Sequence, residues 1–473
     1  MNDLTDVLPT GIQVSYLVAA SLFILGLKKL GSPATARNGN ILSATGMLLA
    51  VLVTLLDQQI LNYQWVLIGV AVGSVIGAII AKTVAMTAMP QMVGFLNGLG
   101  GAASALVAMG EFWRLVHSEA GVPLDATITV ILGIFIGGAT LTGSLVAVSK
   151  LQGIITGKPV TFPLQQPVNI AIAGAFIVSS GFLIANPADQ AAFFTMIGLA
   201  SLFGILFVLP IGGGDMPVVI SLLNSLSGLA ASAAGFVVMN NMLIIAGALV
   251  GASGLILTEI MCKGMNRSLI SVLFGAFGGG GDSGGVPGAS DADLGDKVVR
   301  SIGSEEAAMM LRYARSVVII PGYGMAVAQA QQAIQELAIL LEQGGVEVKY
   351  AIHPVAGRMP GHMNVLLAEA NVPYTQLYDM DDINPQFEQT DVALVVGAND
   401  VVNPGARHDQ GSPIYGMPIL EVDRAKQTIV IKRSLGTGFS GIQNELFFKD
   451  KTTMLFGSAK DMLTQLVSEV KQL

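Results

Sequence analysis

The chain has 473 residues, of which 52% are hydrophobic and only 12% are charged, so its composition excludes an ordinary soluble protein and indicates membrane spans. Its net charge of −8 falls entirely after Arg267, because nine cationic and nine anionic side chains balance up to and including that residue. The sequence therefore joins an apolar N-terminal part to an acidic soluble part, without a basic patch for nucleic acid.

Cysteine and signal-peptide patterns narrow the class further. Cys262 is the only cysteine, which excludes an internal disulfide and a zinc or iron–sulfur centre built from cysteines. No Lys or Arg precedes the first apolar run, so we expect no cleavable signal peptide.

Nine apolar segments are long enough to cross a bilayer: residues 12–27, 40–56, 65–82, 91–113, 126–149, 168–185, 191–211, 216–238 and 242–262. An odd number of spans places the two ends of this part on opposite sides. Eight of the nine cations fall on one side, namely Lys28, Lys29, Arg37, Lys82, Lys150, Lys158, Lys263 and Arg267, and only Arg114 falls on the other. The positive-inside rule then predicts an outside N-terminus and a cytosolic C-terminal domain.

Glycines in these segments repeat at intervals of four residues. The repeats are Gly69, Gly73 and Gly77, then Gly94 and Gly98, then Gly247 and Gly251. Small residues at this spacing allow helix backbones to approach closely in lipid, so we expect a tightly packed bundle.

Four polar side chains lie in or at the ends of the spans: Asn97, Asp215, Asn224 and Glu259. Buried polar groups are costly in a bilayer and mark either hydrogen bonds between helices or a path for protons or solutes. The sequence leaves both interpretations open.

Residues 275–295 are rich in Gly, Ser and Asp and cannot bury enough apolar surface to order themselves. We expect a tether here, either for a domain that reorients or as a passive spacer. The predicted domains are a transmembrane domain over residues 1–267, a flexible linker over 268–315 and a nucleotide-binding domain over 316–473.

The C-terminal part alternates predicted strands with predicted helices. The strands are expected at residues 317–320, 346–352, 374–378, 392–397, 418–422, 428–432 and 453–456, and the main helices at 325–343, 361–371 and 458–472. Such alternation predicts a doubly wound, mostly parallel Rossmann-like sheet that binds ligands at the carboxyl ends of its strands.

A glycine pattern follows the first of these strands. In Gly322-x-Gly324-x-x-Val327, the first glycine suits a sharp turn and the second suits close approach of the backbone to a pyrophosphate. Valine stands where a third glycine is usual, so the pattern alone is weak, and its place between a strand and a helix is what favours dinucleotide binding.

Charge near the strand ends favours NADP over NAD. The strand 346–352 runs into His353 and Pro354 without the acidic residue that usually binds the ribose hydroxyls of NAD. Lys432, Arg433 and Ser434 precede a glycine loop and suit a phosphate monoester, although a solvated strand end is the alternative. His353 and His362 suit structural roles, and we assign neither a catalytic role.

Several long motifs then resemble the β subunit of the proton-translocating nicotinamide nucleotide transhydrogenases. They are PGYGMAVAQAQ, IHPVAGRMPGHMNVLLAEA, VGANDVVNP, KRSLGTGFSG, GDMPVVISLLNS and IMCKGMNRS, and the resemblance covers nearly the whole chain. It implies membrane helices and an NADP(H) domain on this chain, NAD(H) on a separate α subunit, two copies of each half, and a multi-pass protein of a bacterial inner membrane with a periplasmic N-terminus.

The resemblance also implies roles for individual residues. Two segments would surround the pyrophosphate: Gly322, Tyr323, Gly324, Met325, Ala326 and Val327, and Gly357, Arg358, Met359, Pro360, Gly361 and His362. The nicotinamide side would be formed by Gly397, Ala398, Asn399 and Asp400, with Asn399 and Asp400 nearest the chemistry and Asp400 linked to coupling. The 2′-phosphate would meet Lys432, Arg433 and Ser434, followed by Gly438 and Phe439 in the glycine loop.

In the membrane, the resemblance implies a proton path through Asp215 and Asn224, to which we add Asn97 and Glu259. Two departures from the family pattern matter. Many bacterial members have a histidine at Asn97, so a partner helix could supply a histidine instead, and Phe439 replaces a usual tyrosine. We expect no metal.

Hydride transfer between two nicotinamides needs the rings held face to face and dry, rather than an acid or a base. This chain has one fingerprint, so the second dinucleotide must come from the partner, and protonation in the membrane would change the affinity for NADP+ relative to NADPH. The alternative is an NADP(H) sensor that gates a channel or transporter without chemistry.

Overall fold

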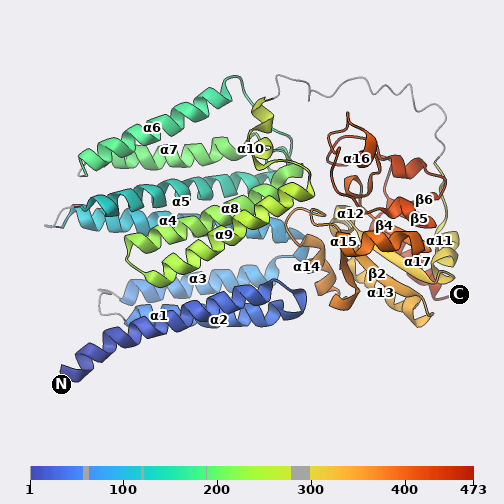
Figure 1. Cartoon of the computed structure of the whole chain (residues 1–473), viewed down its shortest axis with the longest axis horizontal. Coiled ribbons are helices and arrows are strands. Elements are labelled where there is room, and N and C mark those ends of the chain that lie inside the picture. Colours follow the sequence, from blue (N-terminus) through green and yellow to red (C-terminus); the bar gives the residue numbers. More distant parts are fainter. Residues whose placement is uncertain (1, 57–62, 119–121, 188, 279–298) are drawn as a thin grey trace.

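The computed structural model describes residues 2–56, 63–118, 122–187, 189–278 and 299–473. Figure 1 shows an elongated molecule in which a bundle of long helices meets an α/β domain end to end. The tether expected at residues 275–295 lies outside the described residues from position 279 onward. Residues 269–278 form the short helix α10 (Leu269–Gly278), which the sequence did not predict.

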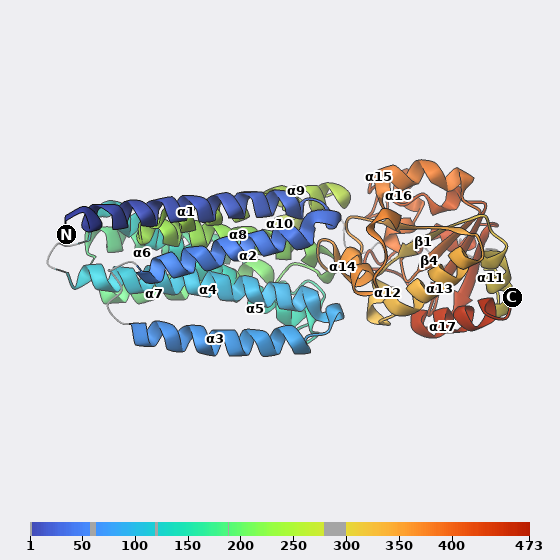
Figure 2. The ribbon, with the colours of Figure 1, turned by 90° about the horizontal axis from the view of Figure 1, so that it is seen from below.

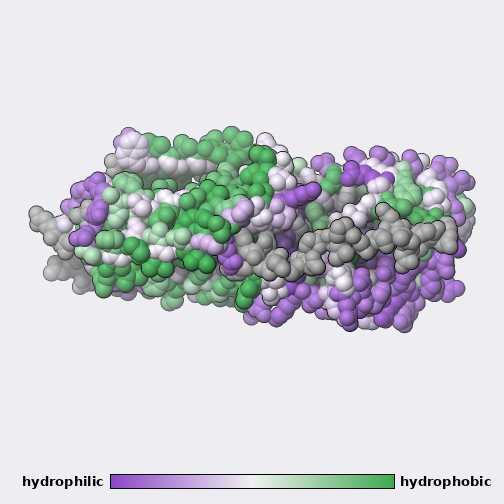
Figure 3. Space-filling view, turned by 90° about the horizontal axis from the view of Figure 1, so that it is seen from above, coloured by the Kyte–Doolittle hydropathy of each residue, from purple (hydrophilic) through white to green (hydrophobic). Residues whose placement is uncertain are grey.

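Nine helices of the described chain are long and apolar enough to cross a membrane, which confirms the predicted spans. They are α1 (Asn2–Leu30), α2 (Pro33–Leu56), α3 (Tyr63–Thr83), α4 (Met89–Val116), α5 (Leu124–Leu151), α6 (Gln165–Ala185), α7 (Gln190–Val208), α8 (Met216–Val237) and α9 (Asn241–Gly264). Figure 3 shows the corresponding apolar surface along the bundle and a hydrophilic surface over the C-terminal domain.

Small residues set the closest contacts within the bundle. A Cβ atom added to Gly137 of α5 would lie 2.5 Å from the carbonyl oxygen of Gly101 in α4, and one added to Gly228 of α8 would lie 2.5 Å from the backbone nitrogen of Gly251 in α9. These helices therefore pack backbone against backbone, as the glycine repeats predict.

The first glycine repeat behaves differently. Nothing lies within 4 Å of a Cβ atom added to Gly69, Gly73 or Gly77, and no described side chain of α3 is buried. The expected packing of this repeat inside the bundle is wrong for α3, and Figure 2 shows α3 standing apart from the other helices.

The C-terminal domain is built on a six-stranded parallel sheet in the order β3-β2-β1-β4-β5-β6. The strands are β1 (Ser316–Pro321), β2 (Glu347–Ile352), β3 (Leu377–Asp379), β4 (Val392–Val396), β5 (Gln427–Lys432) and β6 (Thr452–Phe456). The main helices are α11 (Ser304–Arg312), α12 (Tyr323–Val327), α13 (Gln331–Gln343), α14 (His362–Glu369) and α17 (Ala459–Val470), and the short α15 (Met380–Ile383) and α16 (Gly405–His408) complete the set. The doubly wound Rossmann-like prediction is confirmed.

The strands are buried on both faces because alternate side chains enter two cores. Val317 and Ile319 of β1 pack into a core with α11, α13 and α17, whereas Val318 and Ile320 pack into the core on the opposite face. The continuous β-branched run that the sequence shows at 317–320 thus fills both layers.

Three details differ from the sequence prediction. Residues 418–422 form no strand, because the backbone N–H of Leu420 donates to the carbonyl of Val401 and that of Glu421 to the side chain of Asn384. Residues 374–376 form a 3-10 turn before the short β3. The helix expected at 325–343 is broken into α12 and α13 at Gln329, whose φ of 51° lies in the left-handed region.

The helix α11 was also not expected. It falls within the range assigned to the linker and packs with α17 against one face of the sheet.

The two parts of the molecule touch through loops of the C-terminal domain. The amide of Asn266, just after α9, donates to the carbonyl of Tyr415 at 2.8 Å, and Arg358 donates to the carbonyl of Leu151 at the end of α5 at 3.1 Å. Val355 packs against the buried residues Val218, Met261 and Cys262. In Figure 2, α12 and α14 accordingly lie on the side of the domain that faces the bundle.

Candidate functional site

The strand order reverses between β1 and β4, which is where open parallel sheets bind ligands. The loops that follow these two strands are in backbone contact, since Gly322 N donates to the carbonyl of Val396 at 2.9 Å and Gly324 N to that of Gly397 at 2.8 Å. A Cβ atom added to Gly322 would lie 2.4 Å from the Cα atom of Ala398, so only glycine fits there. The structure therefore brings the two predicted loops together.

The fingerprint after Gly322 itself forms a helix of only five residues, α12, and does not open the long helix that the sequence predicts. Of the predicted contact residues, Met325, Ala326, Met359 and Ala398 are buried in the domain. Their side chains shape the loops from within, and only their backbone atoms can face a ligand. Val327 is exposed.

The segment 357–362 forms a compact turn after β2, with Gly357 at φ 106° and Gly361 at φ 67°. His362 Nδ1 accepts a hydrogen bond from the backbone N–H of Arg358 at 3.1 Å, which places the proton of the neutral ring on Nε2. Burial, together with the Arg358 charge, lowers the pKa of His362 to about 4, so the ring is neutral at pH 7. Its Nε2 is buried and has no hydrogen-bond partner among the described residues.

His353 has a structural role, as expected. Its Nε2 lies 2.8 Å from the carbonyl of Pro418, and its Nδ1 accepts from the backbone of Val355. Burial lowers its pKa to about 4, so this ring is also neutral at pH 7.

Arg358 links the turn to both neighbouring loops. Its guanidinium carbon lies 4.5 Å from the ring centroid of Tyr323, and the Tyr323 ring lies 5.8 Å from the ring of Phe439 in the glycine loop. Burial raises the pKa of Tyr323, so its hydroxyl stays protonated. The cation–aromatic contact and the bond to Leu151 together hold Arg358 at the boundary with the bundle.

Asp400 holds the glycine loop closed. One of its carboxylate oxygens accepts from the hydroxyl of Ser440 at 2.7 Å and the other from the backbone N–H of Ser440 at 3.0 Å. A Cβ atom added to Gly438 would lie 2.5 Å from Asp400, so the loop can pass the carboxylate only as glycine.

Asn399, the neighbour of Asp400, is held by hydrogen bonds from Asn444. Asn444 donates to its carbonyl oxygen at 2.9 Å and to its side-chain oxygen at 3.2 Å, whereas Asn399 Nδ2 is buried without a described partner. The sequence analysis missed Ser440 and Asn444. The only signal for Ser440 was its place as a hydroxyl inside the glycine loop GTGFSG.

The two cations at the end of β5 differ in their surroundings. Lys432 donates to the carbonyl of Gly436, and its Nζ lies 4.8 Å from the centroid of the Phe447 ring. Burial lowers the pKa of Lys432, partly offset by the Asp400 charge. Arg433 and Ser434 are exposed, so they are the groups free to meet an anion from solvent.

The predicted proton-path residues do not form one cluster. Asn97 is buried between α4 and α8, where its amide donates to the carbonyl of Ile220 at 3.3 Å and its carbonyl accepts from Ser227 at 2.8 Å. Asn224 is half-buried on α8. Glu259 faces outward on α9, 68% exposed, and pairs with Lys263 at 2.9 Å.

Asp215 lies just before α8 and pairs with Arg267, whose Nη1 is 2.9 and 3.0 Å from the two carboxylate oxygens. The next residue back, Gly214, lies against Phe439 of the glycine loop: a Cβ atom added to Gly214 would be 3.5 Å from the Phe439 Cβ. Asp215 is therefore separated from Phe439 of the candidate nucleotide site only by its chain neighbour Gly214.

Hydroxyls that the sequence analysis did not single out line the helix contacts near Asn97 and Asn224. Thr258 of α9 donates to Ser221 of α8 at 3.0 Å, and Ser225 donates to the carbonyl of Gly251 at 2.6 Å. Ser144 of α5 is fully buried and its hydroxyl has no hydrogen-bond partner in the described chain.

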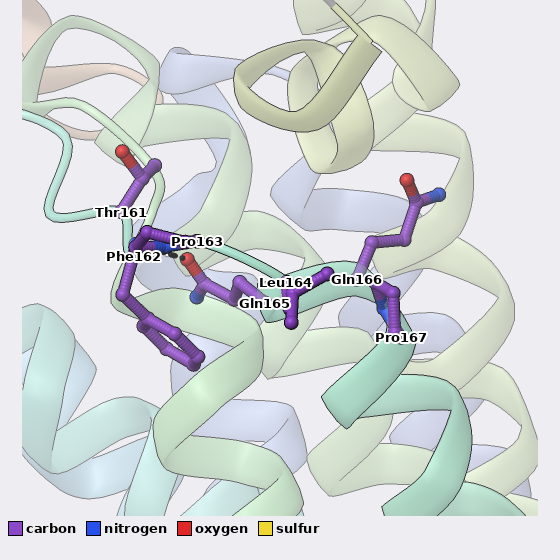
Figure 4. Close-up of a pocket in the computed structure, with 7 residues that line it drawn as sticks. All are labelled: Thr161, Phe162, Pro163, Leu164, Gln165, Gln166 and Pro167. Carbon is purple, nitrogen blue, oxygen red and sulfur yellow. Dashed lines mark hydrogen bonds between the residues drawn. The ribbon is translucent and has the colours of Figure 1, made fainter.

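A separate hollow of about 560 Å³ follows the connection between α5 and α6, along Thr161–Pro167 (Figure 4). Its lining is uncharged, and Phe162 and Gln165 are joined by two hydrogen bonds, from the Phe162 N–H to the Gln165 side chain at 3.4 Å and from the Gln165 N–H to the Phe162 carbonyl at 3.2 Å. It shares no residue with the loops above and does not belong to the candidate nucleotide site. Among the residues that the structure places, no group of three or more His, Cys, Asp or Glu side chains could hold a metal ion.

The sequence is similar to those of known proteins. Residues 12–469 match the family described as "NAD(P) transhydrogenase beta subunit". A curated protein named "NAD(P) transhydrogenase subunit beta" from Rhodospirillum rubrum is 50% identical over 459 residues, covering 96% of this chain and 98% of that protein. A second curated protein of the same name, from a specified strain of that species, matches equally well.

Proposed function

Because this chain belongs to the NAD(P) transhydrogenase beta subunit family, we propose that its C-terminal domain binds NADP(H) and exchanges hydride with NAD(H) held by an α subunit, coupled to proton movement through the helix bundle. The direction we propose is formation of NADPH from NADH. The location we propose is a bacterial inner membrane, with a periplasmic N-terminus, a cytosolic C-terminal domain and two copies of each subunit. The working units are a membrane domain at residues 1–267, a connection at 268–315 and a nucleotide domain at 316–473.

The observation that carries the proposal is the meeting of the loops after β1, β2, β4 and β5 at one edge of the sheet. Gly322, Gly324 and Gly397 let the loops after β1 and β4 pack backbone against backbone, because a Cβ atom on any of them would lie within 2.7 Å of the other loop. This junction stands at the point of the sheet where such folds bind a pyrophosphate. The buried, unpartnered donors His362 Nε2 and Asn399 Nδ2 are groups of the kind that a polar ligand satisfies.

Selectivity for NADP(H) rests on charge at the strand ends. The strand β2 ends at Ile352 without an acid, and Arg433 and Ser434 are exposed after β5. An arginine with an adjacent hydroxyl binds a phosphate monoester through charge-assisted hydrogen bonds. Lys432 supports them by holding the glycine loop through Gly436.

When bound, the nicotinamide supplies the hydride chemistry, so the protein has to position and desolvate it. Asn399 and Asp400 lie at the carboxyl end of β4, and Asp400 closes the glycine loop through Ser440. A closed loop excludes water from the site and fixes the face that the ring presents to the partner.

Coupling requires that a membrane event change the nucleotide site. We propose that the Asp215–Arg267 pair acts on the site through the contact between Gly214 and Phe439. A proton that crosses a membrane potential of roughly 150–200 mV supplies about 3.5–4.6 kcal/mol, because one charge gains about 2.3 kcal/mol per 100 mV. That energy can favour release of NADPH over NADP+ if the two states of the loop differ in affinity.

The test is hydride transfer in sealed proteoliposomes that contain the chain and its α subunit. We expect NADH-dependent reduction of NADP+ that responds to an imposed proton gradient, with an NADPH/NADP+ ratio that falls when an uncoupler is added. An unchanged ratio would refute the coupling. Tight NADP(H) binding with no hydride exchange against an NAD(H)-loaded α subunit would instead favour a sensor.

A further inference from the structure

The helix α10 is apolar but too short to cross a membrane. Its ten residues, LISVLFGAFG, include no charged side chain. An α-helix of this length extends about 15 Å, roughly half of the hydrocarbon thickness of a bilayer. The segment therefore has to find another apolar environment.

One side of α10 is already packed against the bundle. Val272 is 3% exposed and contacts the cluster of Val218, Met261 and Cys262, and Leu273 packs against the neighbouring cluster around Ile220. Ser268 caps the start of the helix by accepting from the backbone N–H of Ser271. The helix is thus fixed at the end of α8 and α9 that faces the C-terminal domain.

Its position relative to the bilayer follows from α9. That span ends at Gly264 and α10 begins at Leu269, so α10 starts within a few residues of the membrane surface. Figure 1 shows α10 running across the direction of the spans, and not along it. A helix in this orientation lies parallel to the bilayer plane.

Among the described side chains of α10, Ile270 is the exposed apolar one. Ile270 is 72% exposed, although it lies outside the spans. The connection between α5 and α6 repeats the pattern at the same end of the bundle, where Ile154 and Leu164 are 74% and 73% exposed and Phe162 lines the hollow of Figure 4. Two separate segments therefore present large apolar side chains at the level where the spans end.

We propose that α10 and the connection between α5 and α6 lie in the boundary between lipid headgroups and acyl chains, as an in-plane anchor beside the C-terminal domain. The apolar side chains enter the acyl region, while Lys158 of the connection, which is exposed and has no described ion pair, reaches the phosphate groups. The anchor fixes the point at which the connection to the nucleotide domain leaves the membrane. The proposal depends only on the spans and not on the proposed enzymatic activity.

The test measures lipid contact at Ile270 in the full chain. Trp65 and Trp113 are replaced by Phe, and a single tryptophan is introduced as Ile270→Trp. The variant is reconstituted in phosphatidylcholine liposomes in which one acyl chain is brominated either near its carbonyl end or near its methyl end. We expect blue-shifted emission and quenching several-fold stronger by the carbonyl-end bromine, which lies at the depth of an in-plane helix.

Two further variants make the result decisive. Leu164→Trp should respond in the same way, and it keeps the proposal testable should Ile270→Trp fail to fold. Tyr313→Trp, at a site 76% exposed on the C-terminal domain, is the matched control and should show emission typical of water without quenching.

Either of two outcomes overturns the proposal. Emission from Ile270→Trp and Leu164→Trp that matches the Tyr313→Trp control would place these segments in water. Blue-shifted emission that no brominated lipid quenches would mean that protein, either a second copy or a partner subunit, covers them.

Discussion

Lys432 and Arg433 are adjacent in the chain, but the structure gives them separate tasks. The Lys432 ammonium turns back to the carbonyl of Gly436 and the ring of Phe447, whereas Arg433 points to solvent. The prediction from the sequence placed both cations in one phosphate site. The fold suggests that Arg433 carries most of the selectivity for the 2′-phosphate, with Lys432 holding the loop.

Arg433→Gln should therefore weaken NADPH binding selectively. A charge-assisted hydrogen bond is worth roughly 1.5–3 kcal/mol, which corresponds to about a 10- to 150-fold rise in the dissociation constant. The measurement is calorimetric titration of the reconstituted chain with NADPH. Lys451→Gln, which removes an exposed cation before β6, should leave the affinity unchanged, and equal losses in the two variants would argue for a general charge effect.

Two buried histidines make the nucleotide domain sensitive to acid. The pKa values of His353 and His362 are lowered to about 4, below the unfolded value of about 6.5. Above pH 6.5 both states are neutral and nothing changes. As the pH falls from 6.5 towards 4, the unfolded state takes up protons that the folded state does not, so stability is lost.

At pH 5 this loss should reach about 2 kcal/mol for each histidine relative to pH 7.5, since one pKa unit corresponds to about 1.36 kcal/mol. Protection factors of the β1 and β4 amides, obtained by hydrogen exchange in the full chain at the two pH values, would measure this loss. His353→Gln should reduce the pH dependence. Protection factors that are the same at both pH values would contradict the expectation.

The part of the site that could be predicted from the sequence is the part that depends on backbone conformation. Gly322 and Gly324 are identifiable because spaced glycines directly after a strand are typical of few structures, among them the dinucleotide-binding turn. Ser440 and Asn444 were missed, because their roles depend on the path of the glycine loop back to Asp400 and Asn399, which no local spacing encodes.

Among the elements, long apolar spans and β-branched strands were predicted with their approximate limits. The failures lie where tertiary contacts replace local preference. Residues 418–422 have the composition of a strand, but the side chain of Asn384 and the carbonyl of Val401 take the backbone groups that a sheet would pair. The apolar α10 was overlooked because a ten-residue run satisfies neither the rule for a span nor the pattern of a soluble helix.

Glycines of the bundle differ in how closely they are packed, which yields a matched test. Gly137→Ala places a Cβ atom 2.5 Å from the Gly101 carbonyl and should cost about 1–3 kcal/mol of bundle stability, as overpacking does. Gly69→Ala meets nothing within 4 Å and should be neutral or slightly stabilising.

The stabilities of the two variants can be compared by unfolding the full chain in mixed micelles with an increasing fraction of a denaturing detergent. A loss of stability for Gly69→Ala as large as that for Gly137→Ala would mean that α3 packs against the bundle after all.

At the scale of the whole molecule, the loops that we assign to NADP(H) face the bundle. Arg358 and Phe439 contact Leu151 and Gly214, so an NAD(H) domain cannot reach the same edge while these contacts last. The proposed hydride transfer would therefore require the C-terminal domain to leave this position, and the connection over residues 268–315 would have to permit it.

Locking the junction should stop the reaction without emptying the site. In a Cys262→Ala background, Asn266→Cys with Tyr415→Cys replaces a contact of 2.8 Å between the Asn266 amide and the Tyr415 carbonyl by a crosslinkable pair. We expect oxidation to abolish hydride transfer from NADH while bound NADPH is retained, and reduction to restore transfer. Each single cysteine variant serves as the control, and undiminished transfer by the crosslinked protein would show that this docked arrangement is itself competent.

The isolation of α3 has a consequence for how the protein is made. Within the described chain this helix has no buried side chain, so a newly inserted copy presents a glycine-lined face to lipid until another protein arrives. We expect the proposed assembly partner to cover this face, so that survival of the newly made subunit depends on the supply of that partner. Expression of this chain without the proposed α subunit should accordingly yield less product at steady state, because of faster turnover and not of slower translation.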